Sequence, residues 1–229
     1  MTKSRKFQEW RTYHVTHRCH NRDFLLKTDL DRREYIRLMW EAHKRWDLSV
    51  LSYIVTSNHV HMLLASRKLE EMGGFMGQVS GGMSRFYNRR KGRLGSFWEG
   101  RYRATLIQDG AHLSRCLFYI AMNMVRAGVV RHPREWDWSS HHELCGGRQR
   151  YRLLDIDRLL NKLMIPSEEE FLTWYEKTIA DILTRRRNLR REPWWSSSSI
   201  VGDLDFVSGF VENRRRDDIV SLDNETFYI

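Results

Sequence analysis

Apolar and polar residues along the first part of the chain follow a period of two in several short runs. Residues 11–19 (RTYHVTHRC), 48–57 (LSVLSYIVTS) and 59–66 (HVHMLLAS) are rich in β-branched and apolar residues, which is typical of strands. The last two runs are separated by a tight turn and predict a hairpin. Residues 96–109 (SFWEGRYRATLIQD) predict a loop that leads into a fourth strand.

Helical periodicity separates these strands. Residues 29–46 have apolar side chains at helical spacing, the Gly-rich stretch 69–90 predicts a second helix, and 109–130 predicts a third that ends at Gly128. The order is strand, helix, strand, strand, helix, strand, and then a helix outside this repeat. That order predicts an α+β fold of the ferredoxin-like kind, an antiparallel sheet with helices on one face.

After about residue 142 the chain changes in character. The sequence predicts a domain at 1–142 and a mostly helical, basic C-terminal extension at 143–229. Residues 192–200 (EPWWSSSSI) are typical of a loop or linker. Helices are expected at about residues 155–163, 167–191 and 203–216.

The charge of the chain favours a polyanionic partner. Lys and Arg number 39 against 29 Asp and Glu, a net charge of +10. Nucleic acid is therefore the first partner to consider and an anionic membrane surface the second. Three dispersed cysteines without a C-x-x-C spacing argue against a zinc knuckle or a disulfide framework and favour a reducing cytosol. The first ten residues lack the apolar stretch of a signal peptide, and no run predicts a membrane helix, so a cytoplasmic protein is expected.

Two histidines interrupt the apolar strand at 59–66. His59 and His61 are two residues apart and therefore point to the same face of the strand, together with Leu63. Imidazoles ~6–7 Å apart along one face can converge on a single divalent ion. The alternative is a pair of ordinary half-buried histidines with hydrogen-bond partners, and the spacing alone does not separate the two interpretations.

A tyrosine and an asparagine stand four residues apart in the third predicted helix. Tyr119 and Asn123 therefore lie on one helix face, beside the apolar stripe, where a side chain reaches a cleft. An amide oxygen suits Mg²⁺ or Mn²⁺, which favour oxygen ligands and accept imidazole. Taken alone, Tyr119 is equally explained as an amphipathic side chain at the rim of the core.

Together these four residues predict a phosphoryl-transfer site. A phenol with a pKa of ~10 is a poor nucleophile at neutral pH and needs an activated electrophile. A metal held by His59, His61 and Asn123 would polarise a phosphodiester for attack by Tyr119. The product would be a covalent phosphotyrosine, which stores the energy of the broken bond so that a second DNA end can be joined without ATP.

Five segments resemble the REP-associated tyrosine transposases, which belong to the single-tyrosine HUH endonucleases. The resemblance extends over roughly residues 11–142 and includes the histidine strand, which is similar to the family's G-N-H-x-H-x-L-L motif. The segments are YHVTHRCHNRDFLL (13–26), TSNHVHMLLAS (56–66), GRLGSFWEGRYRATLI (92–107), FYIAMNMVRAGVV (118–130) and WDWSSHHEL (136–144).

The resemblance implies roles for the same residues. It makes His59 and His61 metal ligands, Tyr119 the nucleophile and Asn123 the occupant of the third ligand position, with Mg²⁺ or Mn²⁺ as the cofactor. Such enzymes of bacterial cytoplasm cut single-stranded DNA, form a 5′-phosphotyrosine and release a 3′-hydroxyl. The implied substrate is an imperfect hairpin of the REP type, and no membrane partner is implied. Both a monomer and a dimer are compatible with the resemblance.

Departures from the family pattern fall outside the four site residues. Cys19 replaces a glycine, Met124 replaces a proline, and Ala65 and Ser66 stand where an acidic residue is common. They bear on loop geometry and on the DNA sequence that is bound.

Basic and aromatic residues interleave in residues 84–103 and predict a DNA-binding surface. Aromatic rings there could stack on unpaired bases while arginines hold phosphates; the alternative is core aromatics with solvated arginines. A second surface is expected from the arginines of 185–191 with Trp194 and Trp195. The predicted DNA-binding residues are Arg18, Asn21, Arg22, Arg90, Arg93, Phe97, Trp98, Arg101, Tyr102 and Arg103.

Two other functions remain open from the sequence. One is a domesticated protein that binds hairpin DNA and no longer cuts it, although a pure binder has no need of all four site residues. The other is a replication or mobilisation initiator with the same chemistry, an enzyme class that often has a third histidine ligand and another motif order. Tyr87 and Tyr102 are rival nucleophiles, but neither has a ligand-type residue one helical turn away.

Overall fold

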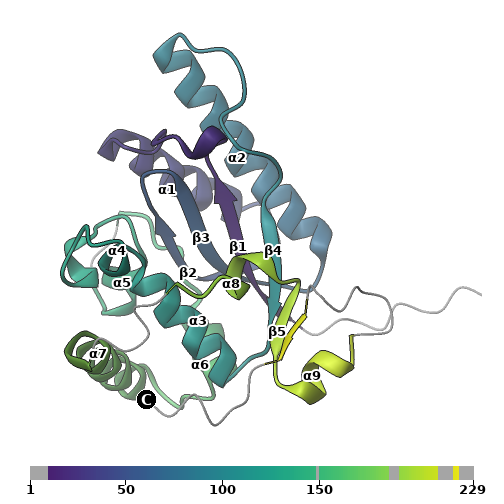
Figure 1. Ribbon diagram of the computed structural model, residues 1–229, viewed down its shortest axis with the longest axis vertical. Coiled ribbons are helices and arrows are strands. Elements are labelled where there is room, and N and C mark those ends of the chain that lie inside the picture. The colour runs from purple at the N-terminus through teal and green to yellow at the C-terminus, as the bar shows by residue number, and fades with distance from the viewer. Residues whose placement is uncertain (1–9, 148–149, 186–190, 211–218, 222–229) are drawn as a thin grey trace, which may run out of the picture.

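The sheet at the centre of the molecule has six strands. The computed structural model describes residues 10–147, 150–185, 191–210 and 219–221. The strand order is β2-β3-β1-β4-β5-β6 (Figure 1). The strands are β1 (Arg11–Arg18), β2 (Leu48–Val55), β3 (His59–Ser66), β4 (Arg103–Ile107), β5 (Ile200–Gly202) and β6 (Ile219–Ser221).

The first four strands and two helices form the predicted repeat. β1 pairs antiparallel with both β3 and β4, and β2 pairs antiparallel with β3 as the expected hairpin. α1 (Asp29–His43) connects β1 to β2, and α2 (Leu69–Lys91) connects β3 to β4. The α+β fold with a ferredoxin-like arrangement is therefore confirmed. The remaining short helices of this part are η1 (His20–Arg22), η2 (Pro133–Glu135) and α5 (His141–Leu144).

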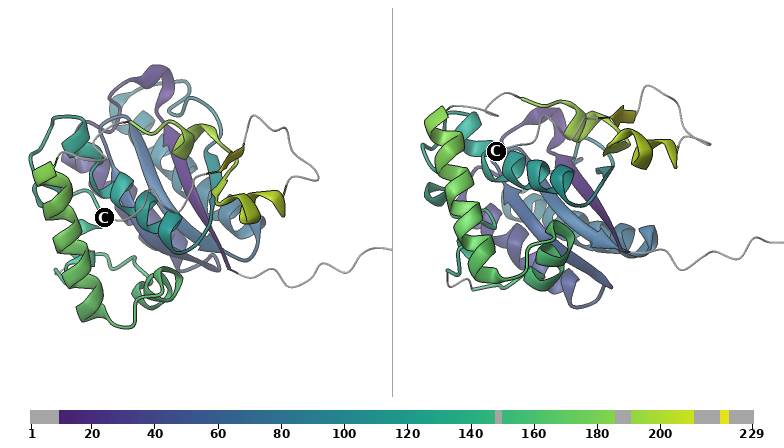
Figure 2. Two further views of the ribbon diagram at one scale, coloured as in Figure 1. Left: turned by 60° about the horizontal axis from the view of Figure 1, so that its bottom comes forward. Right: turned by 90° about the horizontal axis from the view of Figure 1, so that it is seen from below.

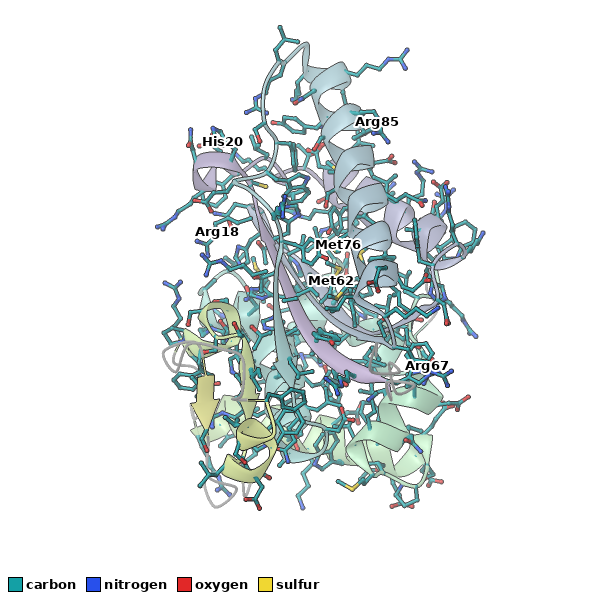
Figure 3. The ribbon with its side chains drawn as sticks, turned by 90° about the vertical axis from the view of Figure 1, so that its right-hand side faces the viewer. Arg18, His20, Met62, Arg67, Met76 and Arg85 are labelled. Carbon is teal, nitrogen blue, oxygen red and sulfur yellow. The ribbon has the colours of Figure 1, made fainter. Side chains whose placement is uncertain are left out.

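Both helices of the repeat cover one face of the sheet, as predicted. Alternate residues of β3, among them Met62, point into the core on this face, where Met62 and Met76 point toward each other (Figure 3). The glycines of α2 bring α1 close: a Cβ on Gly82 would lie 2.7 Å from Leu38 Cδ2. This close approach explains the presence of a glycine at position 82 in spite of its poor helix propensity, because a larger residue would collide with α1.

A second layer of helices covers the opposite face. It comprises α3 (Ala111–Ala121), α4 (Asn123–Arg126), α6 (Ile156–Leu163) and α7 (Glu168–Arg185) (Figure 2). The other residues of β3, Leu63 and Ala65, belong to this core. His61 lies on the same face of the strand as Leu63, as the sequence predicts, and the structure places α3 over that face.

The predicted single helix at 109–130 is in fact two helices. Met122, with φ −83° and ψ 5°, interrupts it between α3 and α4. Arg126 compensates for the interruption: both terminal nitrogens of its guanidinium lie 3.3 Å from the carbonyl oxygen of Tyr119. α4 ends at Arg126, two residues before Gly128, the expected end, where the chain has a φ of 71°.

The prediction of a loop or linker at 192–200 is also wrong. Residues Trp194–Ser197 form a short helix, α8, and the chain then enters β5, which pairs parallel with β4. Trp195 is fully buried, so it anchors the segment to the core and does not contribute to a second DNA surface. This segment is fixed on the sheet because its large apolar side chain packs beside α3.

The rest of the C-terminal extension agrees in part with the sequence. α6 (Ile156–Leu163) agrees with the helix predicted at 155–163. α7 is described up to Arg185, and residues 186–190 of the helix predicted at 167–191 lie outside the described chain. α9 (Leu204–Ser208) is shorter than the expected 203–216, of which 211–216 also lies outside the described residues. β5 and β6 extend the main sheet, whereas a division into domains at residue 142 stays a prediction.

Candidate active site

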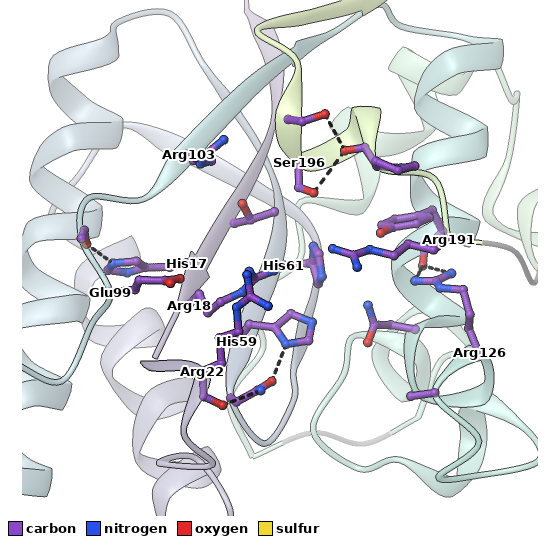
Figure 4. A pocket seen from close by; sticks show the side chains of 18 of the residues that line it. His17, Arg18, Arg22, His59, His61, Glu99, Arg103, Arg126, Arg191 and Ser196 are labelled. Atoms are coloured by element: carbon purple, nitrogen blue, oxygen red, sulfur yellow. Dashed lines mark hydrogen bonds between the residues drawn. The ribbon is translucent and has the colours of Figure 1, made fainter. Parts of the chain in front are cut away.

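A cavity of about 930 Å³ opens beside the centre of the sheet and brings together the four residues singled out from the sequence. His59 and His61 come from β3, Tyr119 from α3 and Asn123 from α4. β1 and the segment 191–197 supply further walls (Figure 4). Residues from distant parts of the chain therefore share one site.

His59 is held by polar groups of the β2–β3 turn. Its Nδ1 lies 2.7 Å from Asn58 Oδ1 and 3.0 Å from Thr56 Oγ1. The Asn58 amide nitrogen donates to the Arg22 carbonyl, and the Thr56 hydroxyl donates to the His59 carbonyl, so both oxygens can accept from His59. His59 Nδ1 therefore carries the proton, and its Nε2 presents a lone pair.

His61 contacts a histidine that sequence analysis did not single out. His61 Nδ1 lies 2.9 Å from Nε2 of His14, a fully buried residue of β1. The His59 and His61 rings have their centroids 4.9 Å apart. Burial, reinforced by nearby arginines, lowers the pKa of His59 to about 4. Burial, reinforced by His59 and His14 and then by arginines, lowers the pKa of His61 well below its usual value. Both imidazoles are consequently neutral at pH 7, the state that binds metals.

Tyr119 lies next to this histidine pair. Its ring centroid is 5.9 Å from that of His61, and its side chain is 8% exposed. Burial raises the pKa of the phenol, while the charge of Arg126, whose guanidinium carbon lies 4.1 Å from the ring centroid, opposes that increase. The hydroxyl is therefore protonated in the resting protein and close to a permanent positive charge.

Asn123 reaches the cavity in spite of the break in the helix. It is 7% exposed and begins α4, one residue after the interruption at Met122. Tyr119 and Asn123 thus share the cavity, although the unbroken helical turn expected between them is absent. Within the described chain, no three His, Cys, Asp or Glu side chains are arranged to hold a metal ion. Asn123 brings an amide oxygen to the cavity that contains the two histidines.

Arginines dominate the walls of the cavity. Four residues predicted to bind DNA line it. Arg126, which the prediction omitted, and Arg191, which was assigned to a second surface, add two cations, against the one carboxylate of Glu99 among the described lining residues. Figure 4 shows Arg191 and Arg126 on one side of the histidines and Arg18 and Arg22 on the other. The four predicted residues are Arg18, Arg22, Arg101 and Arg103.

Four other residues predicted to bind DNA are buried in the core or paired with other protein groups. Phe97 and Trp98 are 1% and 7% exposed within the core under α2, which contradicts a base-stacking role. Trp98 stacks on His17 with ring centroids 4.0 Å apart. Arg90 pairs with the buried Asp31. Arg93 binds the Asn88 side chain and the Ser96 carbonyl, so it holds the loop after α2.

The two remaining candidates lie at the edge of this region. Tyr102 is half-buried and packs against the α2 core, outside the residues that line the cavity. Asn21 is exposed in η1, with a φ of 51°, directly before Arg22. Arg191 belongs to the basic stretch predicted as a second DNA surface, but residues 186–190 of that stretch lie outside the described chain.

Sequence reasoning missed two residues of the site, His14 and Arg126, and assigned a third, Arg191, to a separate surface. Arg126 falls inside a family-like segment, FYIAMNMVRAGVV, and His14 inside another, YHVTHRCHNRDFLL, so both could have been weighed. Arg191 had a weaker signal because only the folded chain brings it to the cavity.

The histidine strand, the neighbouring tyrosine and the basic cavity correspond to the class predicted from the sequence motifs, a DNA-processing transposase. Comparison with known proteins agrees: the family described as "Transposase IS200 like" matches residues 9–123, just over half of the chain. The chain belongs to this family. No described helix has both the length and the apolar character needed to cross a membrane.

Two solved structures resemble the chain. One is a REP-associated tyrosine transposase bound to a REP hairpin, with 16% identity, a TM-score of 0.49, and coverage of 68% of this chain and 93% of the other. The second is a candidate transposase from Deinococcus radiodurans, with 18% identity, a TM-score of 0.37, and coverage of 45% and 84%. No curated protein matches the chain.

Proposed function

We propose that this protein is a metal-dependent single-stranded DNA endonuclease and strand transferase that acts on REP-like hairpin DNA through a 5′-phosphotyrosine. The observation that carries the proposal is the meeting of Tyr119, His59, His61 and Asn123 in one arginine-lined cavity. A protein that only binds DNA gains nothing from a tyrosine placed beside two neutral imidazoles.

The residues present fit a divalent metal. His59 Nδ1 is occupied by Asn58 and Thr56, and His61 Nδ1 by His14, so each imidazole keeps Nε2 for an ion. Asn123 would supply an amide oxygen, and Mg²⁺ or Mn²⁺ accepts such a mixed set. When bound, the metal supplies Lewis-acid activation of the phosphodiester and partial neutralisation of its charge.

The tyrosine performs the displacement. Tyr119 Oη attacks the phosphorus, the bond from phosphorus to the 3′ oxygen breaks, and the new bond joins the 5′ phosphate to the phenol. The phenol proton passes to solvent in the cavity, and the departing 3′ oxygen takes up one proton, so charge and atoms balance. In the reverse direction a 3′-hydroxyl of another strand attacks the phosphotyrosine and regenerates Tyr119, which transfers the strand.

The cavity arginines would orient the DNA. Arg18 and Arg22 lie on one side of the histidines, and Arg126 and Arg191 lie on the other (Figure 4). Arg126 also covers the ring of Tyr119. Guanidinium groups bind phosphate oxygens in a bidentate manner, so two such sides can fix the strand on each side of the scissile phosphate. The REP-like hairpin as the substrate and membership of the REP-associated subgroup rest on the five sequence segments named above.

The test is capture of the covalent product. Hairpin oligonucleotides from the source genome, labelled at the 3′ end, are incubated with the protein and Mn²⁺ or Mg²⁺ and separated on a denaturing protein gel. We expect a labelled band at the size of the protein plus the 3′ fragment, because the 5′ phosphate remains on Tyr119. The same DNA labelled at its 5′ end should release a free fragment with a 3′-hydroxyl.

Matched variants identify the nucleophile. Tyr119→Phe or added EDTA should remove the labelled band, whereas Tyr102→Phe, a change outside the residues that line the cavity, should retain it. Binding of the hairpin without a covalent band under any metal would replace this proposal with the catalytically silent hairpin-binding protein. A band that persists in Tyr119→Phe would assign the chemistry to another residue.

A further inference from the structure

His14 connects the C-terminal segment to the histidine pair. Its ring lies in the core between β3 and α8, fully buried, and both of its nitrogens have partners. Nε2 lies 2.9 Å from His61 Nδ1, and Nδ1 lies 2.6 Å from the carbonyl oxygen of Trp195. The planes of the two imidazoles differ by only 11°, an orientation that suits a hydrogen bond between their ring edges. The two contacts of His14 therefore form a continuous chain of hydrogen bonds from the Trp195 carbonyl to His61.

The carbonyl at one end sets the direction of this chain. A carbonyl oxygen only accepts hydrogen bonds, so His14 Nδ1 must carry a hydrogen. His14 is fully buried and both of its nitrogens have uncharged partners, so the ring has a single hydrogen; with that hydrogen on Nδ1, Nε2 has a lone pair. That lone pair accepts the hydrogen of His61 Nδ1. His61 Nε2 is then left with its lone pair available to the cavity.

We propose that His14 is a positioning residue, held by the Trp195 carbonyl, that fixes His61 in the tautomer whose Nε2 can bind a metal. The proposal rests on the proposed function, in which His61 is a metal ligand. An unfixed imidazole would populate the other tautomer, with a hydrogen on Nε2, and that form cannot coordinate an ion through this atom.

The C-terminal segment is anchored firmly enough for this task. Trp195 donates from Nε1 to Glu192 Oε2 at 2.5 Å, and Glu192 forms an ion pair with Arg115 of α3. The Trp195 carbonyl also accepts from Thr105 Oγ1 at 3.2 Å. The carbonyl is therefore held from two sides, and residues beyond the family match at 9–123 contribute to the histidine site.

His59 provides an internal comparison. Its Nδ1 binds Asn58 and Thr56 of its own turn, so its tautomer is set locally and does not depend on His14. Loss of His14 should therefore change His61 and leave His59 as it is. A general loosening of the active site would alter both histidines.

The test measures tautomers in the metal-free protein. Long-range ¹H–¹⁵N spectra of protein labelled in its histidines distinguish a protonated ring nitrogen from one with a lone pair, and single variants assign the signals. We expect a hydrogen on Nδ1 and none on Nε2 for both His14 and His61 at pH 7. A hydrogen on His61 Nε2, or a charged His14, would overturn the proposal whether or not any variant folds.

Variants extend the test to metal affinity. His14→Leu should give a mixture of His61 tautomers and leave the His59 tautomer unchanged. Calorimetry should show that its Mn²⁺ dissociation constant is larger by ~10–100-fold. His141→Leu, which removes another buried histidine outside the cavity, should leave the His61 tautomer and Mn²⁺ affinity unchanged. An unaltered His61 tautomer in His14→Leu would refute the relay. Absence of Mn²⁺ binding by the wild-type protein would refute the proposed function alone, because the tautomers are measured without metal.

Discussion

Tyr119 illustrates how neighbouring groups tune a single side chain. Burial raises the pKa of its phenol, which disfavours the nucleophilic phenolate, and Arg126 is the strongest opposing influence. Arg126 has two contacts with the same residue, because its guanidinium covers the ring and binds the Tyr119 carbonyl. The arginine therefore both holds Tyr119 in place and favours the charged form of its phenol.

Replacement of Arg126 should raise the pKa of Tyr119. We expect Arg126→Gln to shift the phenol titration to higher pH, because the opposing positive charge is lost while burial remains. The adduct should form more slowly at a fixed pH, by about tenfold for each unit of increase if the phenolate is the attacking form. The pKa is measured by NMR titration of protein labelled at the tyrosine ring carbons.

Arg126→Lys separates the two roles of the arginine. It retains a positive charge but lacks the planar fork, so the pKa of Tyr119 should stay closer to the wild-type value than in Arg126→Gln. If the Gln variant leaves the titration of Tyr119 unchanged, Arg126 has only a structural role.

Among the elements, α2 shows how local sequence serves the packing of its neighbours. Its glycines are poor helix formers, but some of them lie where α1 approaches most closely. Gly82 faces the buried Leu38, whereas Gly77 has open space around its α-carbon. Two glycines of one helix therefore have different reasons to be there.

Alanine substitutions in α2 should have opposite effects at these two positions. Gly82→Ala should lower the free energy of unfolding, because its Cβ would lie 2.7 Å from Leu38 Cδ2 and overpacking costs ~1–3 kcal/mol. Gly77→Ala should raise it by ~0.5–1 kcal/mol, the usual gain in helix propensity. Urea unfolding curves measure both, and equal shifts for the two variants would contradict the close-packing explanation.

The elements also show what local patterns can and cannot predict. The βαββαβ order, the hairpin and both helices of the repeat were predictable, because each has strong periodicity in its own sequence. The break at Met122 was not predictable from the local pattern. It depends on a side chain after the break, because the guanidinium of Arg126 donates hydrogen bonds to the Tyr119 carbonyl. Residues 192–200 have the composition of a linker, yet the burial of Trp195 and the pairing of β5 with β4 override it.

On the scale of the whole molecule, the site is assembled from segments that are far apart in sequence. The common face of His59 and His61 was predictable from strand spacing, whereas Asn123 reaches the cavity of Tyr119 from α4, after a break that helix spacing did not predict. His14 could not be assigned a partner from sequence, because its contact with Trp195 spans 181 residues. Long-range contacts of this kind depend on the packing of the complete fold.

The net charge of the chain is +10, and its arginines include a group that lines the cavity and others that are paired elsewhere with carboxylates. Six arginines line the cavity that contains Tyr119, and Glu99 is the one acidic residue among the described residues of its lining. Others are neutralised by pairing, as Arg37 is by Glu34 and Glu41 on α1. Charge that is not paired within the protein is available for phosphates, so the cavity arginines should dominate the salt dependence of DNA binding.

Arg103→Gln should weaken hairpin DNA binding and also reduce its sensitivity to salt. Each phosphate contact on a single strand contributes a slope of ~0.7 to the dependence of the logarithm of the association constant on that of salt concentration. We therefore expect fluorescence anisotropy titrations to show a slope smaller by ~0.7, with an affinity loss that is similar for different hairpin sequences. Arg37→Gln, which removes the same charge from a paired site, should leave the slope unchanged. Equal slopes in both variants would mean that net charge, and not the cavity, attracts the DNA.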